Sequence, residues 1–201
     1  MRRRRLLGVT GFALCPSIVG CLDSDSETED STDDSTQPTD GAENTNTPAD
    51  EQATEERIHT EWPWGAYADY EAVDIFVDSP EGETLGGVRA ALALTPDERY
   101  LGLSDAEEMP EEGGMLFVFD SPSDQTFVMR EMDFGIDIIY ADENRTITEI
   151  HHAPEPGPDQ DGNEQRYPGY GQYVLEVSYE WSLRHGISEG DVLDFELPSE
   201  N

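Results

Sequence analysis

The chain has 201 residues, of which 46 are aspartate or glutamate and 11 are arginine, and its formal net charge at pH 7 is −35. It contains no lysine. Such a chain is a poor partner for DNA or RNA, because non-specific affinity for nucleic acid depends on basic side chains that neutralise phosphates.

The acidity extends through the part of the chain that we expect to fold. From residue 58 onward the sequence has 33 acidic residues and 6 arginines, a net charge of −27. Repulsion between so many carboxylates destabilises a compact state unless salt screens it. We therefore expect a halophilic protein, similar in charge to proteins of salt-loving archaea.

Residues 1–21 have the layout of a secretory signal peptide. Four arginines precede a moderately apolar run over residues 6–19, which is too short for a membrane-spanning helix of ~20 residues. The "RRRLL" segment resembles a twin-arginine export signal. The "IVGC" segment at residues 18–21 resembles a lipobox, in which cleavage precedes the cysteine and a lipid is attached to it.

We expect Cys21 to be lipidated and Cys15 to be removed with the signal, which leaves no disulfide in the mature protein. The lipid would hold the protein at the extracellular face of the cell membrane. Residues 22–60 are rich in Asp, Glu, Ser, Thr and Pro and have few large apolar side chains, so we predict a disordered acidic tether. The alternative is a signal cleaved elsewhere, with Cys21 unmodified.

Residues 61–201 are predicted to form one globular domain. Apolar residues alternate at Val73, Ile75 and Val77, which is typical of a half-buried strand. Further apolar runs separated by turns predict strands within residues 92–94, 115–120, 126–132, 136–142, 146–152, 173–179 and 191–197. Residues 153–172 hold proline, glycine and acids without periodicity, which predicts a long loop.

The segment "TPDE" predicts the start of a helix. Thr95 can cap it, Pro96 suits the first helical position, and Glu98 can return a hydrogen bond to the cap. We expect this helix to continue to about Ser104. A second short helix is expected in "EWSLRHG", with Gly186 ending it in a left-handed conformation. The pattern predicts a mostly β fold, a compact antiparallel β sandwich or partly closed barrel with one or two short helices.

Four segments carry a resemblance to a known family: "ERYLGLSD", "EEGGMLFVFD", "FVMREMDFGIDIIYADENRTITEI" and "YVLEVSYEWSLRHGISEGDVL". They are similar, in order and spacing, to the blocks of the domain of unknown function 192 family over about residues 88–195. The resemblance implies a mostly β fold and bacterial and archaeal members that are often exported, without an established activity. The chain departs from the family pattern at Ser104, at residues 129–132 and at Gly135.

The segment "VMREMDFGIDI" predicts a candidate site. If Asp133 and Phe134 form a two-residue turn, Arg130 falls opposite Asp137 on paired strands. This pair is either an ion pair that fixes register or the polar centre of a pocket beside an aromatic loop that includes Tyr173. In the second interpretation the ligand-binding residues are Met129, Arg130, Asp137, Tyr167 and Tyr170.

Other candidate chemistry is sparse. The histidines at positions 59, 151, 152 and 185 lack helical metal-ligand spacing, and the adjacent His151 and His152 would point to opposite faces of a strand. We expect no metal and no cofactor. The "NRT" triplet makes Asn144 a glycosylation acceptor in a predicted, exposed hairpin turn.

Three functions are consistent with the sequence. The first is a monomeric, lipid-tethered domain that binds a ligand or envelope component without catalysis. The second is a hydrolase-type enzyme that uses Asp137 and Arg130, with His151 as a further candidate, and it requires these groups to meet in one cleft. The third is an accessory factor for exported proteins.

Overall fold

The computed structural model describes residues 58–199. The predicted signal peptide, Cys21 and nearly all of the predicted tether lie outside these residues. Among residues 58–199, no helix has both the length and the apolar character needed to cross a membrane.

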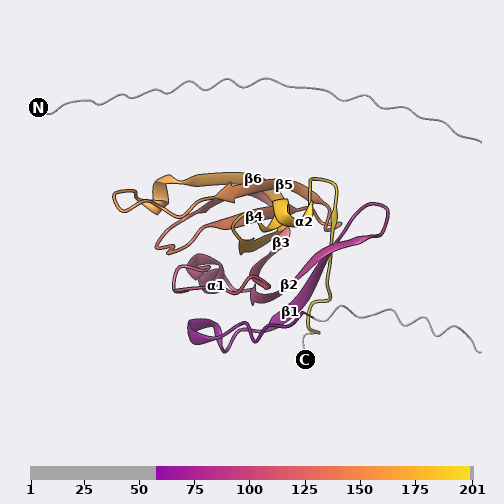
Figure 1. The fold of residues 1–201 in the computed structure, drawn as a ribbon, viewed down its shortest axis with the longest axis horizontal. Helices are drawn as coiled ribbons and strands as arrows, with labels where there is room; N and C mark the ends of the chain where they lie inside the picture. Colours follow the sequence, from indigo (N-terminus) through magenta and orange to yellow (C-terminus); the bar gives the residue numbers. More distant parts are fainter. Residues whose placement is uncertain (1–57, 200–201) are drawn as a thin grey trace, which may run out of the picture. The chain divides into compact units, whose positions relative to one another are not determined.

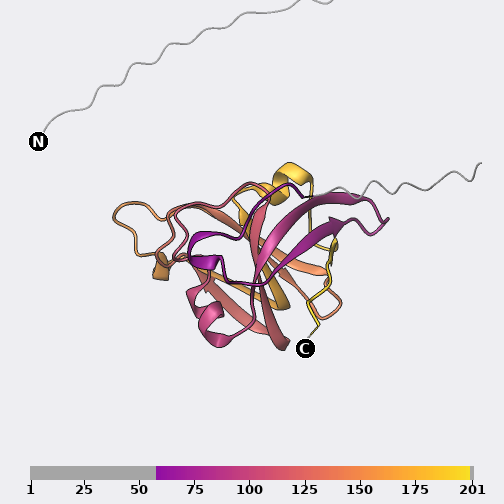
Figure 2. The ribbon, with the colours of Figure 1, turned by 90° about the horizontal axis from the view of Figure 1, so that it is seen from below.

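The described chain forms one seven-stranded sheet in the order β5-β4-β6-β3-β2-β1-β7 (Figure 1). The sheet curls on itself into a half-barrel (Figure 2). The elements are η1 (Gly65–Tyr67), β1 (Ala72–Asp78), β2 (Thr84–Ala93), α1 (Pro96–Leu101), β3 (Gly113–Val128), β4 (Ile136–Ala141), β5 (Ile147–Ala153), η2 (Gly162–Glu164), β6 (Arg166–Ser178), α2 (Trp181–His185) and β7 (Val192–Asp194). The prediction of a mostly β, partly closed barrel with two short helices is confirmed.

The strand pairing differs from a simple antiparallel meander in one respect. Strands β2 and β3 run parallel, with Ala91 opposite Met115, whereas the other paired strands of the described chain are antiparallel. A parallel pair needs a crossover connection. Here α1 and the segment that follows it make that crossover, and so they cover one face of the sheet.

The predicted helix signals are confirmed in detail. The Thr95 hydroxyl accepts a hydrogen bond from the Glu98 amide at 3.3 Å, and the Glu98 carboxylate accepts one from the Thr95 amide at 2.8 Å. Helix α1 ends at Leu101, earlier than predicted, because Gly102 leaves the helical region with φ at +54°. Gly186 ends α2 in the left-handed conformation, with φ at +68°.

The sheet buries apolar side chains on both faces, in two clusters. The cluster that we call the first core contains side chains from every strand and Trp181 of α2. The second core lies on the opposite face, under η1, α1 and the loop between β3 and β4. Its buried members are Trp62, Tyr67, Ala91, Ala93, Leu103, Ala106, Met115, Phe117, Met129, Met132, Ile136, Ile138, Tyr140, Ala153 and Val174.

The predicted loop over residues 153–172 is too long, because β6 already begins at Arg166. The first half of β6 pairs with the far half of β3. Glycine is required there: a Cβ at position 169 would approach the Tyr140 ring to 2.6 Å, and one at position 171 would approach the Ala141 carbonyl oxygen to 2.6 Å. The glycines that allow the backbones to approach also make the segment resemble a loop.

Candidate functional site

The predicted pairing of Arg130 with Asp137 is wrong. Strands β3 and β4 are not neighbours, because β6 lies between them and pairs with both. The residues between Val128 and Ile136 form a connection across β6 and not a two-residue hairpin turn. The two side chains therefore have separate surroundings.

Asp137 is completely buried, and its carboxylate accepts four hydrogen bonds. The donors are Nδ1 of His152 at 2.7 Å, the amide of Glu180 at 2.8 Å, and the amide and hydroxyl of Ser182 at 2.9 and 2.6 Å. The amides belong to the start of α2, whose first backbone N–H groups have no partner within the helix. Asp137 thus anchors α2 to the sheet and has no free lone pair directed at a ligand.

The remaining predicted site residues are dispersed. Met129 is fully buried, Tyr167 is half-buried, and Tyr170 is 50% exposed on β6. His151 lies against the Tyr167 ring, with centroids 5.6 Å apart, and its Nε2 is 2.7 Å from the carbonyl oxygen of Pro168. Arg130, Asp137 and His151 do not meet, so the cleft that the hydrolase hypothesis requires is not formed by these three residues.

Asn144 is exposed in the turn that joins β4 to β5, as predicted. The Asp142 carboxylate accepts hydrogen bonds from the amides of Asn144 at 2.8 Å and Thr146 at 2.9 Å, which fixes the turn. Its glycosylation stays a prediction.

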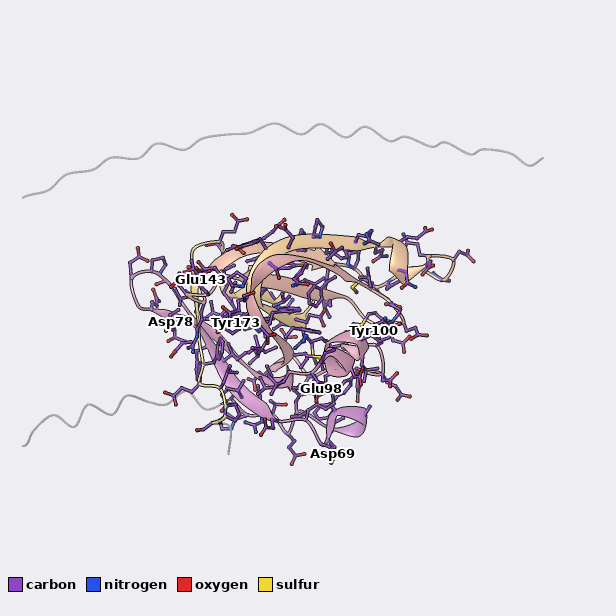
Figure 3. All side chains as sticks on the ribbon, turned by 180° about the vertical axis from the view of Figure 1, so that it is seen from behind. Asp69, Asp78, Glu98, Tyr100, Glu143 and Tyr173 are labelled. Atoms are coloured by element: carbon purple, nitrogen blue, oxygen red, sulfur yellow. The ribbon has the colours of Figure 1, made fainter. Side chains whose placement is uncertain are left out.

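Arg130 instead lines a cavity of about 440 Å³ between α1 and β3. Ligand pockets commonly measure about 300 to 1,000 Å³. Tyr100 extends from α1 at this cavity (Figure 3). The apolar lining consists mainly of Tyr100, Leu101, Leu103, Phe117, Phe119, Phe127, Val128 and Met132, and the charged lining consists of Arg99, Arg130 and Glu176.

Glu176 is the least expected member of this lining. Its side chain projects from the middle of β6 between Met115 of β3 and Ile138 of β4, and the residue is only 4% exposed. Among residues 58–199, no hydrogen bond reaches its carboxyl group. Burial raises the pKa of Glu176 to about 8, because an apolar environment disfavours the charged form.

Two arginines lie along the same cavity, and each is held by carbonyl oxygens. The Arg99 guanidinium donates to the carbonyl oxygens of Leu94 and Val118, the latter at 2.9 Å. The Arg130 guanidinium donates to the carbonyl oxygen of Tyr100 and stacks 4.2 Å from the centre of that ring.

Neither arginine forms an ion pair with a carboxylate of residues 58–199. Both guanidinium charges are therefore available to an anion, in a domain where acids greatly outnumber arginines. The cavity therefore holds two of the six arginines of residues 58–201.

Sequence reasoning identified Arg130 but missed Glu176. The signal was present in "YVLEVSY", where a single acid interrupts an apolar run in a strand that has both faces buried. A charged residue at such a position is rare unless it is paired or functional. The run predicts a strand over residues 173–179, but the strand pattern by itself does not assign Glu176 to a cavity.

Comparisons with known proteins agree with this fold. Residues 77–195 match the DUF192 family, described as "Uncharacterized ACR". A protein from Sinorhizobium meliloti 1021, described as a candidate transcription regulator, is similar with 25% identity and a TM-score of 0.57, over 63% of this chain and 95% of its own.

A second solved structure, of a protein of unknown function from Novosphingobium aromaticivorans DSM 12444, has 27% identity and a TM-score of 0.57. That likeness covers 66% of this chain and 91% of the other. A search of curated proteins found no match.

Proposed function

Because the chain belongs to the DUF192 family, whose description states no activity, we propose a function from the cavity itself: the domain binds a small amphipathic anion without transforming it. The observation that carries this proposal is the combination of an aromatic and aliphatic cavity with two guanidinium groups that pair with no carboxylate of the described chain. An apolar ligand body would displace water from the lining, and an anionic group would lie near Arg99 and Arg130.

The hydrolase alternative receives less support, because its three residues lie in separate surroundings. The description of the Sinorhizobium relative as a candidate regulator concerns that protein. We do not extend DNA binding to this chain, because a domain with 33 acids and 6 arginines has few groups to neutralise phosphates.

We further propose that the domain acts at the extracellular face of the membrane of a halophilic cell. The support is the order of the N-terminal segments: an arginine-rich start, a short apolar run, "IVGC" and an acidic tether. Mass spectrometry of the mature protein tests this location. A lipid on Cys21 at the new N-terminus is expected, and an intact N-terminus on a cytosolic protein would contradict it.

Binding is tested with two fluorescent probes in molar salt, using the full chain. Anilinonaphthalene sulfonate has an aromatic body and an anionic group, and phenyl naphthylamine is a matched probe without the charge. We expect the sulfonate to bind more tightly, and Arg130→Ala to weaken it by about tenfold, since hydrogen bonds to charged groups exceed neutral ones. The uncharged probe should change little.

Arg89→Ala is the matched control. Arg89 pairs with Asp74 at 2.8 Å on the surface, and it does not line the cavity. This variant should leave both probes unaffected. Equal loss of sulfonate binding in the two arginine variants, or binding of neither probe, would overturn the proposed function.

A further inference from the structure

We propose that Glu176, in its protonated form, is the hydrogen-bond donor that selects the inner end of the ligand. The ligand accordingly carries an uncharged acceptor oxygen, the carbonyl of a ketone, ester or amide, at the end opposite its anionic group. This inference rests on the proposed function, because it concerns the same cavity and the same ligand.

The geometry places the Glu176 carboxyl group at the cavity wall. The residue lines the cavity and is 4% exposed. Among the described residues, no side-chain nitrogen or oxygen is both fully enclosed and without a hydrogen-bond partner. The carboxyl oxygens of Glu176 have no hydrogen-bond partner, so they must keep some accessible surface. Because Glu176 lines the cavity, we infer that this surface faces the cavity.

The groups that face Glu176 do not compensate a negative charge. Its neighbours across the strands are Met115 of β3 and Ile138 of β4. The titratable groups near it are Tyr67 of η1 and Tyr140 of β4, and burial raises the pKa of both, that of Tyr67 to about 12. Both phenol groups therefore stay neutral over the pH range in which Glu176 titrates.

The nearby hydroxyl and guanidinium groups have other partners. The Tyr140 hydroxyl donates to the carbonyl oxygen of Tyr167 at 2.7 Å, and the Tyr67 hydroxyl accepts from the Asp105 amide at 3.1 Å. Arg99 and Arg130, from α1 and from the loop after β3, line the cavity but donate to carbonyl oxygens.

A protonated Glu176 therefore has an O–H group without an acceptor, beside apolar ligand space. A buried polar group without a partner is destabilising, and a ligand oxygen would satisfy this donor. A ligand with an inner ammonium group fits less well. It would bring a positive charge into a cavity that two arginines already line, and it would have to ionise a carboxyl group that burial keeps neutral.

Two isosteric probes test the inference by calorimetry on the full chain in molar salt. Para-acetylbenzoate has a carbonyl oxygen opposite its carboxylate, and para-isopropylbenzoate replaces that carbonyl with a C–H and methyl group. At about pH 6 we expect the acetyl compound to bind more tightly by about three- to tenfold, which is the usual contribution of one hydrogen bond. At about pH 9, above the pKa of about 8, the carboxylate repels the carbonyl oxygen, and the preference should disappear.

Two variants separate the donor from the charge. Glu176→Gln keeps an N–H donor and cannot ionise, so it should retain the preference for the acetyl compound at both pH values. Glu176→Leu removes the donor and should bind the two compounds equally. Both variants remove a buried ionisable group, so both should remain folded, and near-ultraviolet circular dichroism checks this.

Each outcome bears on one of the two proposals. Equal binding of the two benzoates to the unmodified protein at about pH 6 would overturn the role of Glu176 while leaving anion binding intact. Stronger binding of para-(aminomethyl)benzoate than of either compound would also overturn it, in favour of a cation. If the naphthalene sulfonate and both benzoates fail to bind, the proposed function itself fails.

Discussion

The sheet buries two carboxyl groups on neighbouring strands and gives them opposite surroundings. Asp137 of β4 pairs with Val177, and Glu176 of β6 pairs with Ile138, so the two acids are one register position apart. Asp137 lies on the face of the first core and Glu176 on the face of the second core, because side chains alternate along each strand. Asp137 accepts four hydrogen bonds, and Glu176 makes none with the described chain.

The contrast arises from the elements that cover each face. On the first face, α2 begins directly over Asp137 and contributes the Ser182 amide and hydroxyl. On the other face, the segment around α1 brings mainly apolar side chains and leaves a cavity beside Glu176. Burial alone therefore does not reveal the role of an acid in this fold. The number of donors that reach it separates an anchor from a group that is available to a ligand.

The largest expected effect comes from removing the anchor. Asp137→Ala leaves four donors without their acceptor, and an unsatisfied buried donor costs about 1–3 kcal/mol. Because His152 and Glu180 are partly exposed, we expect a loss of about 3–5 kcal/mol in the free energy of unfolding. Denaturant titration in molar salt measures it. Asp74→Ala, which breaks an exposed ion pair, is the control and should cost at most about 1 kcal/mol.

A loss for Asp137→Ala no larger than that of the control would remove the distinction between the two acids. The four hydrogen bonds would then contribute no more to stability than an ion pair on the surface.

The second prediction concerns Glu176, whose replacement should raise the free energy of unfolding where the replacement of Asp137 lowers it. Its pKa is about 8 in the folded protein and 4.5 ordinarily, so between these values the folded state holds a proton that the unfolded chain has lost. Stability should fall as pH rises through this window, by at most about 1.4 kcal/mol per pH unit, and level off above it. Glu176→Gln should abolish this fall and be more stable than the unmodified protein by about 2–4 kcal/mol at about pH 9.

The measurement is the difference in unfolding free energy between the two proteins across the pH range, which cancels the titration of other acids and histidines. A difference that does not change between about pH 5 and about pH 9 would show that Glu176 is ionised throughout. The protonated donor would then be unavailable to a ligand.

Features that depend on neighbouring residues are predictable from this sequence, whereas the order of the strands is not. Apolar runs predicted most of the strands, although the strands predicted at residues 115–120 and 126–132 are one strand, β3, in the structure. Thr95, Glu98 and Gly186 predicted the helix ends, because these signals depend on near neighbours. The insertion of β6 between β3 and β4 depends on contacts between distant segments, and no local pattern encodes it. For this reason the pairing of Arg130 with Asp137, each three positions from the predicted turn at Asp133 and Phe134, is wrong.

Glu176 was missed for a related reason. Its position in an apolar run was visible, but its burial follows from the segment near α1 covering that face. The cavity is lined by residues from α1, β3 and β6. It can therefore be recognised only when the order of the strands in the sheet is known.

The smallest expected effect tests whether all four hydrogen bonds to Asp137 contribute to stability or whether one of them dominates. Ser182→Ala removes one hydroxyl donor at 2.6 Å and leaves the Ser182 amide, the Glu180 amide and His152 in place. We expect a loss of about 1–2 kcal/mol, well below that of Asp137→Ala. Ser188→Ala is the control, because its hydroxyl lies 3.4 Å from the Asp191 carboxylate at an exposed position.

Combining Ser182→Ala with Asp137→Ala completes the cycle. The hydroxyl has no acceptor once Asp137 is gone, so the double variant should be no less stable than Asp137→Ala alone. Additive losses would mean that Ser182 stabilises the fold through packing, and that the carboxylate is satisfied mainly by backbone amides. In that case Asp137 differs from Glu176 because the backbone amides at the start of a helix reach it. A single hydroxyl group near Glu176 would then not be enough to give Glu176 the same stabilising role.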